Sequence, residues 1–149
     1  MFPNAKGSEQ LSILATLDPG NQAAGAASTG WVALNTHHGL LALVQTGALA
    51  TGSTVDAKLQ QALDTSGTGA KDVAGKAITQ LTQASNGANR QALINLRPEE
   101  LDVNNGFAFV RLVVTVATAA ANTSAQLLGV NPRLASAETA NQAAVAQIV

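Results

Sequence analysis

The feature of this sequence that most constrains its fold is a hydrophobic period of two, which recurs in one short segment after another. In EQLSILATLD, residues 9–18, the apolar Leu11, Ile13 and Ala15 share one side of an extended chain. Successive side chains of a β-strand point to opposite faces, so this alternation is typical of a strand with a buried face. Segments of this kind, separated by turn residues at intervals of about 8–12 residues, predict an antiparallel sandwich or barrel.

Glycine, proline and asparagine separate the predicted strands, as expected of turns. Asp18-Pro19-Gly20-Asn21 predicts the first turn, and Asn86-Gly87 is the strongest short signal for a hairpin. The segment GLLALVQTG is apolar on both faces, which is typical of a central strand in a sheet covered on both sides. The predicted strands cover residues 9–18, 29–36, 39–47, 53–66, 72–83, 89–97, 107–118 and 123–130.

Three segments carry a weaker or different signal. Residues 53–66 also fit a helical period through Val55, Leu59 and Ala62, although the strand is preferred. AAGAAST, residues 23–29, fits a loop or a strand of small residues. Residues 97–102 predict a single helical turn, because proline favours a helix start and glutamate its positive end.

We therefore predict one all-β domain over residues 9–130, an antiparallel β-sandwich or jelly-roll-like barrel with extended N- and C-terminal arms. Residues 1–8 are polar and interrupted by Pro3 and Gly7, so they predict an N-terminal arm. Residues 131–149 are rich in alanine and would bury too little surface to hold a helix unaided. We expect this C-terminal tail to order against a neighbouring subunit or partner.

Composition narrows the classes of function. Charged residues make up 11% of the chain and the formal net charge is −1. A nucleic-acid-binding protein needs a basic face, so nucleic acid is not an expected partner. Disulfides, zinc thiolate sites and cysteine nucleophiles are excluded because the chain has no cysteine. We expect neither a signal peptide nor a membrane span, because no apolar run has the necessary length.

One stretch, Asp64-Thr65-Ser66-Gly67, suggests catalysis at first sight. An aspartic protease has Asp-Thr-Gly or Asp-Ser-Gly twice, whereas here an extra residue intervenes and there is no second copy. A phosphate loop needs GxxxxGK followed by a hydroxyl residue. Gly69 to Lys76 has one residue too many, and Ala77 replaces the hydroxyl. We interpret residues 64–69 as a Gly-rich turn.

The other titratable residues form no catalytic pattern. His37 and His38 are adjacent, so on a strand they point to opposite faces and do not chelate one metal together. We interpret them as a polar pair at a strand end, with a pH-sensitive interface contact as the alternative. Glu99, Glu100 and Asp102 fit a solvated helical turn better than a glycosidase pair. We predict no catalytic residue, no metal and no cofactor, and hence no enzyme.

Two further residues stand out by their context. Arg111 is the only charge in FAFVRLVVTVAT, and we expect it on the outer face or paired with a carboxylate of residues 99–102. A buried charge at an interface is the alternative. Trp31 is the only tryptophan. We predict a core position for it, with an interface anchor as the alternative.

From about Leu40 to Arg133 the chain resembles a family of small virion proteins of tailed bacteriophages. The resemblance lies in LQQALDTSGTGAKDVAGKAITQLTQ, QALINLRPEELD, GFAFVRLVVTV and SAQLLGVNPR, and it spans roughly two thirds of the chain. It implies a β-sandwich structural component. Several such proteins resemble capsid decoration or cement proteins, which bind as trimers on the head and bridge capsomers.

The function implied is that of a capsid decoration protein on the surface of a phage head, made in the host cytoplasm. Its expected partners are the major capsid protein or other virion proteins, and further copies of the chain, with a trimer favoured. The alternatives are a tail or head–tail connector protein and a carbohydrate-binding sandwich. The residues expected to contact partners are Phe2, Pro3, Trp31, His37, His38, Arg111 and Arg133.

Overall fold

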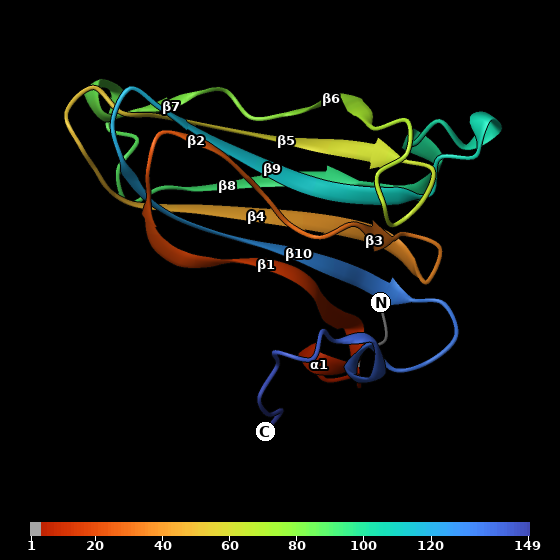
Figure 1. The fold of residues 1–149 in the computed structure, drawn as a ribbon. Helices are drawn as coiled ribbons and strands as arrows, with labels where there is room; N and C mark the ends of the chain where they lie inside the picture. The colour runs from red at the N-terminus through yellow and green to blue at the C-terminus, as the bar shows by residue number, and fades with distance from the viewer. Residues whose placement is uncertain (1–3) are drawn as a thin grey trace.

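The computed structural model describes residues 4–149 and shows two antiparallel β-sheets facing each other (Figure 1). The strands are β1 Leu11–Gln22, β2 Gly25–Ser28, β3 Val32–Ala33, β4 His37–Leu49, β5 Thr54–Ala62, β6 Lys71–Ala77, β7 Leu81–Thr82, β8 Gln91–Leu96, β9 Phe109–Ala117 and β10 Ala121–Pro132. Sheet I has the order β1-β10-β4-β8. Sheet II has the order β2-β9-β5-β6, with β3 also paired to β9 and β7 to β5.

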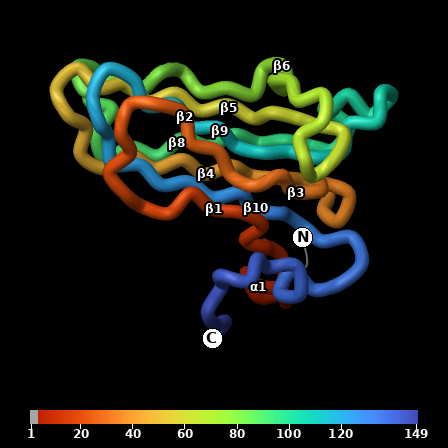
Figure 2. Tube along the Cα trace, viewed as in Figure 1, coloured from red at the N-terminus to blue at the C-terminus, as the bar shows by residue number. Residues whose placement is uncertain are grey.

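This strand order is that of a jelly roll. The chain crosses repeatedly between the sheets, so that β1 and β10, the first and last strands, lie side by side in sheet I. Figure 2 shows the trace passing from one layer to the other at both ends of the sandwich. Two facing sheets built from Greek keys in this way define the jelly-roll architecture. The predicted all-β antiparallel sandwich of jelly-roll type is confirmed.

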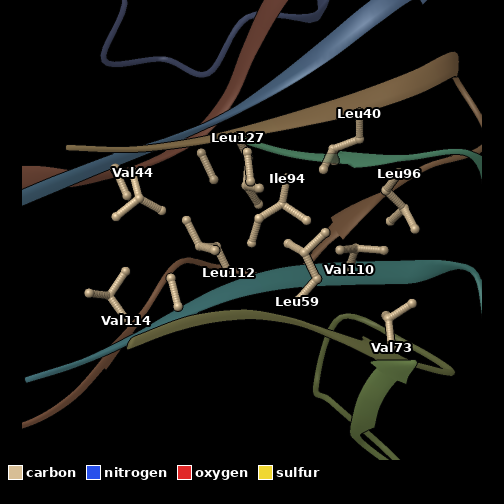
Figure 3. Packing of buried hydrophobic residues seen from close by; sticks show 14 of the residues in the cluster. Leu40, Val44, Leu59, Val73, Ile94, Leu96, Val110, Leu112, Val114 and Leu127 are labelled. Atoms are coloured by element: carbon tan, nitrogen blue, oxygen red, sulfur yellow. The ribbon is translucent and has the colours of Figure 1, made fainter. Parts of the chain in front are cut away.

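The inner faces of the two sheets form the core, because alternate residues of each strand point inward. Leu59 and Leu112 are paired neighbours in sheet II, and neither has exposed surface. Val44 and Leu127 of sheet I are equally buried. Figure 3 shows side chains from both sheets meeting in the space between them. Packing of these two apolar layers holds the sandwich together.

The first predicted turn is wrong, because β1 continues through residues 18–21. The register of β1 against β10 shifts between Leu17 and Gly20, so Asp18 and Pro19 form a bulge within the strand. Proline has no N–H to pair and is tolerated at bulges of edge strands. Since β1 is an edge of sheet I, the bulge replaces the turn at little cost.

The strand predicted over residues 72–83 is interrupted. β6 ends at Ala77, and pairing with β5 resumes only at Leu81 in β7. Gly75 has φ 72°, and the β5–β6 register shifts there by several residues. A glycine in the left-handed region makes a bulge of this kind possible.

The Asn86-Gly87 signal marks a connection between the sheets and not the predicted hairpin. The 3-10 helix η1, Gln83–Ser85, ends at Asn86, which has φ 58°. This connection leads from β7 in sheet II to β8 in sheet I. The local turn chemistry is therefore as expected, but the strands it joins do not pair.

The three segments with a weaker or different sequence signal have defined local structures. Residues 54–62 are a strand and not a helix, and the small-residue segment contains β2. The predicted helical turn is confirmed as the 3-10 helix η2, Pro98–Glu100, which is followed by η3, Val103–Asn105. Within residues 4–149, no helix is long and apolar enough to cross a membrane.

The C-terminal tail differs from the expected extended arm. The short helix α1, Gly7–Gln10, and the 3-10 helix η4, Ala137–Ala140, lie together against the start of β1 (Figure 1). In the single chain, residues 137–142 lie on β1 of the same chain, and their predicted contact with a neighbouring subunit or partner stays a prediction. The hydrogen bonds of Ser12 and Asn141 supply the attachment that the alanines lack.

We expect Leu112→Ala to lower the free energy of unfolding by about 2–5 kcal/mol, because it opens a cavity between the sheets. Urea denaturation followed by circular dichroism measures this loss. Leu93→Ala is the matched control, since Leu93 is 58% exposed. Its effect should stay within about 0.5 kcal/mol. Equal losses for the two variants would contradict the placement of the core.

Candidate functional site

The Asp64 loop, residues 64–69, uses its carboxylate to bind its own backbone. Asp64 Oδ1 accepts hydrogen bonds from the N–H groups of Ser66 at 2.9 Å and Thr68 at 3.0 Å. These contacts hold the pKa of Asp64 below its ordinary value. The hydrogen bond from the Thr68 side chain has the largest effect, and the backbone hydrogen bonds add to it. Gly67 and Gly69 supply the positive φ angles of the loop. The interpretation of this stretch as a Gly-rich turn is confirmed.

His37 and His38 begin β4 and lie on opposite sides of sheet I, as their adjacency predicts. His38 is exposed, whereas His37 has no exposed surface. Its own chain encloses the His37 ring, and the suggested contact of His37 with a partner stays a prediction. Gly129 leaves the necessary room, since a Cβ there would lie 2.6 Å from His37 Nε2.

Two hydroxyl groups hold the buried ring. Ser12 Oγ lies 3.0 Å from His37 Nε2, and Thr36 Oγ1 lies 2.9 Å from Nδ1. Ser12 Oγ donates its hydrogen to the Ala137 carbonyl at 2.7 Å, so we assign Nε2 as donor and Nδ1 as acceptor. A serine beside a histidine suggests a nucleophile and its base. Here both side chains are fully buried and the serine hydrogen points elsewhere, so the pair is structural.

Burial lowers the pKa of His37, because the imidazolium loses its hydration. The unfolded chain then binds a proton more readily than the folded chain, and the free energy of unfolding falls as the pH drops through about 6.5. We expect His37→Gln to flatten this dependence between about pH 7 and 5. Urea denaturation at a series of pH values measures the effect. Parallel profiles for the two proteins would contradict it.

The acidic cluster at residues 99–102 ties η2 and η3 to β6. Lys76 Nζ lies 2.9 Å from Glu100 Oε1, and Lys71 Nζ is bonded to Asp102. These two lysines are the main reason why the pKa values of Glu100 and Asp102 lie below their ordinary range. Between residues 4 and 149, no group of three His, Asp or Glu side chains is placed to hold a metal ion.

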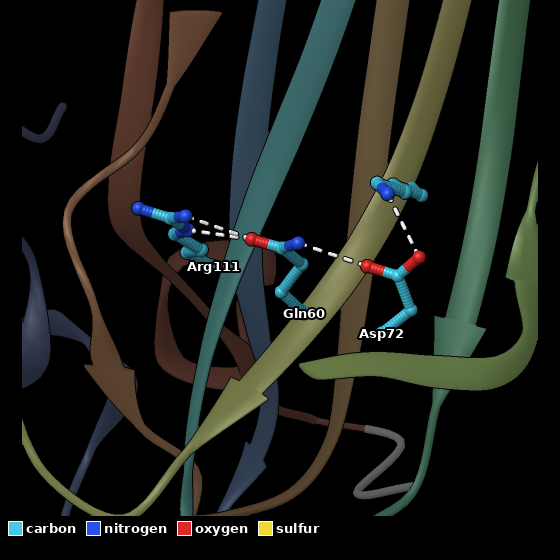
Figure 4. Close-up of polar contacts among 4 residues, drawn as sticks. Gln60, Asp72 and Arg111 are labelled. Atoms are coloured by element: carbon cyan, nitrogen blue, oxygen red, sulfur yellow. Dashed lines mark hydrogen bonds and ion pairs between the residues drawn. The ribbon is translucent and has the colours of Figure 1, made fainter. Parts of the chain in front are cut away.

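A row of polar side chains crosses the outer face of sheet II (Figure 4). Arg111 donates from Nε and Nη2 to Gln60 Oε1, at 3.0 and 2.8 Å. Gln60 Nε2 donates to Asp72 Oδ1 at 2.8 Å, and Lys58 Nζ lies 2.7 Å from Asp72 Oδ2. Arg111 thus lies on the outer face, as predicted, with an amide and no carboxylate as its partner. The polar side chains of this face therefore already have hydrogen-bond partners among themselves.

Trp31 is half-buried outside sheet II, so its predicted core position is wrong. The guanidinium of Arg111 lies over the ring, 4.6 Å from its centroid. The Asp64 loop approaches from another direction, since a Cβ at Gly67 would lie 2.6 Å from Trp31 Nε1. Leu34, three residues later, is the fully buried residue of this segment. Trp31 therefore anchors the loop, and its role at an interface stays a prediction.

We expect Gly67→Ala to destabilise the chain more than Gly52→Ala does. Both glycines have positive φ, 83° and 79°, which costs an alanine about 1–2 kcal/mol. Only the Gly67 variant also meets Trp31, because the nearest atom to a Cβ at Gly52 is 3.6 Å away. Urea denaturation gives the difference, and Trp31 fluorescence should change in the Gly67 variant alone. Matching stabilities and spectra would contradict this contact.

The outer face of sheet I is apolar, and we call it the apolar face. Leu43 pairs with Leu93 on β8, and Leu41 pairs with Leu128 on β10, so four leucines adjoin across three strands. Leu93 is 58% exposed, and the other three are half-buried. The outward side chains that pair with them or adjoin them on these strands are uncharged: Leu11, Ile13, Thr16, Gln45, Gln91, Asn95, Asn122, Ser124, Gln126 and Val130. Asp18 lies at the margin of this face, where Thr16 Oγ1 donates to its carboxylate at 3.2 Å.

The sequence of β4 already indicated an apolar outer face. GLLALVQTG is apolar on both sides, which predicted a sheet covered on both faces. The chain itself covers only the inner side, where Leu40, Ala42 and Val44 are buried. Of the residues suggested for partner contacts, His38 lines a hollow of about 590 Å³ together with Leu40, Lys76 and Glu100.

The last predicted contact residues are at the chain ends. Arg133 is exposed, and its Nε donates to the His37 carbonyl at 3.0 Å. Phe2 and Pro3 lie outside the described residues. The structure therefore brings Arg111 and Trp31 together, and Arg133 and His37, but it does not gather the suggested residues into one site.

The strand edges of sheet I are obstructed. Gln142 N–H donates to the Ile13 carbonyl at 2.8 Å and covers the first part of β1, while Pro19 and its bulge interrupt the second part. On the opposite edge, Lys76 Nζ donates to the Asn95 carbonyl of β8 at 2.7 Å. Free edges are where sheets add further strands. These obstructions favour contacts through the apolar face over contacts through the edges.

No protein-family model matches this sequence, and no curated protein matches it. Among solved structures, a chain of infectious bursal disease virus, Gx strain, is 10% identical in sequence to this chain and superimposes with a TM-score of 0.44. The match covers 93% of this chain and 38% of that chain. Broad bean stain virus has 11% identity and a TM-score of 0.42, covering 90% and 94%. The C-terminal CBM6 of LamC from Zobellia galactanivorans has 7% identity and a TM-score of 0.37, covering 80% and 93%.

The chain is thus distantly similar in structure to jelly-roll capsid proteins of viruses, among other β-sandwich proteins. It spans about two fifths of the bursal disease virus chain. Likeness at this level concerns the fold, and we take no function from it.

Proposed function

We propose that this chain is a structural component of a tailed-phage virion, a capsid decoration protein that binds as a homotrimer and bridges capsomers. The observation that carries the proposal is the apolar face, four adjoining leucines on an uncharged sheet surface. A jelly roll occurs in capsid proteins and also in lectins, so the fold supports a virion role only by analogy. The phage resemblance of residues 40–133 supplies the particular kind of particle.

The size of the apolar face fits assembly on a particle. Four strands about 4.8 Å apart, paired over about six residues, give a surface of roughly 400 Å². A stable pairwise interface needs about 800 Å² on each partner, so this face alone gives weak binding. Many copies bound side by side on a repeating lattice gain strength from multivalency. The partner expected is an apolar, uncharged patch of the major capsid protein.

The polar face of sheet II is the weaker candidate for this contact. Its side chains already satisfy one another from Arg111 to Lys58, and exposed ion pairs of this kind add about 0–1 kcal/mol. Trp31 offers no open platform to a sugar ring, because Arg111 covers its face. These contacts argue against the carbohydrate-binding alternative.

We expect Leu93→Asp and Leu43→Asp to weaken binding to phage heads at least about tenfold, because a carboxylate would be buried against an apolar surface. Co-sedimentation with heads of the phage that encodes the chain measures binding, and light scattering measures the oligomer. Leu134→Asp is the matched control, since Leu134 is 96% exposed beyond sheet I. Circular dichroism confirms that each variant folds.

A strictly monomeric protein with no affinity for heads would contradict the proposal. So would an equal loss of binding in the Leu134 control, because the apolar face would then have no special role. Binding to isolated tails and not to heads would overturn the decoration role in favour of a tail or head–tail connector protein.

A further inference from the structure

The outer edge of β1 is completed by residues 137–142, which we call the C-terminal segment. Ile13 N–H donates to Asn141 Oδ1 at 2.7 Å, and Gln142 N–H donates to the Ile13 carbonyl at 2.8 Å. The segment therefore satisfies both backbone groups of Ile13, as a neighbouring strand would. One residue earlier in β1, Ser12 Oγ donates to the Ala137 carbonyl at 2.7 Å.

This edge requires an occupant. Without the Ala137 carbonyl, the buried hydroxyl of Ser12 would lose its acceptor beside His37. The N–H and carbonyl of Ile13 would also lose their partners. Unpaired backbone groups on a strand edge attract another chain. The chemistry of the site specifies the segment, but it does not specify which copy of the chain supplies it.

The C-terminal segment is held by few groups of its own. Ala137 is its only buried residue. Its further contacts are polar: Ser8 Oγ donates to Glu138 Oε1 at 2.7 Å, and Gln142 Nε2 donates to Thr16 Oγ1 at 3.2 Å. Such hydrogen bonds are exchanged readily, because each has a modest net strength in water.

The connection to the segment is exposed and short. The Arg133 N–H is fixed to the Thr36 carbonyl, and residues 134–136 that follow are all exposed. Three extended residues span about 10 Å, so the segment reaches a second copy only when the β1 strands of the two copies start close together. Exchange of a terminal segment between such neighbours reproduces every contact described above.

We propose that residues 137–142 bind the β1 edge of a second copy of this chain, with Ser12, Ile13 and Thr16 as the receiving site. Two copies that exchange their segments reciprocally form a dimer. If each copy instead gives its segment to the next copy around an axis, the copies form a closed ring. The exchange concerns the chain itself and holds whichever particle the chain joins.

The absence of cysteine makes a disulfide test clean. Ile13→Cys and Gln142→Cys place thiols on two residues whose backbones are hydrogen-bonded. The two single variants are mixed, unfolded in urea, refolded together and oxidised. A disulfide between positions 13 and 142 then forms only between different chains. We expect this cross-link by peptide mass spectrometry, with a shift from one chain to two on a non-reducing gel.

Three controls decide the outcome. A double variant that carries both Ile13→Cys and Gln142→Cys must form the 13–142 disulfide, either within one chain or between two chains. This shows that the geometry permits the bond. Leu134→Cys mixed with Gln142→Cys gives the yield from random collision. Circular dichroism shows that the variants fold. The exchange is supported if the mixed 13–142 cross-link clearly exceeds that background and rises with protein concentration. It is overturned if the double variant closes within single chains while the mixture gives only background.

Discussion

The packing of two apolar layers against each other is the interaction on which the rest of this structure depends. Leu59 and Leu112 from sheet II meet Val44 and Leu127 from sheet I, and all four are fully buried. Once these side chains point inward, the pleat of each strand sends the alternate residues outward. The character of both outer faces is therefore decided by the residues that the core does not use.

The two outer faces differ in what they leave for a partner. On sheet II the outward residues bond to one another from Lys58 to Arg111, and Arg111 covers the ring of Trp31. On sheet I the outward residues are leucines and uncharged polar groups, which have no such way of satisfying one another. A sandwich with one polar and one apolar outer face is suited to lying on another surface. Its obstructed edges limit the addition of strands.

Much of the fold and part of the candidate site could be predicted from local sequence. The alternation in β9, the turn at Asp64 and the opposite orientation of His37 and His38 all follow from the geometry of one extended chain. Predictions failed where a distant segment decided the outcome. Pro19 lies in a bulge because β10 pairs on both sides of it. Trp31 is outside the core because its segment meets the Asp64 loop and Arg111.

What the sequence by itself determined is the period of its strands, the chemistry of its turns and hence the all-β class. These depend on residues next to one another, whose directions the backbone dictates. Only the tertiary structure decided that β4 has one side in the core and the other exposed, and that residues 137–142 lie on β1. The physical reason is that burial is a property of two surfaces together. A sequence segment states that it is apolar, but only the arrangement of the sheets shows which of its faces another segment already covers.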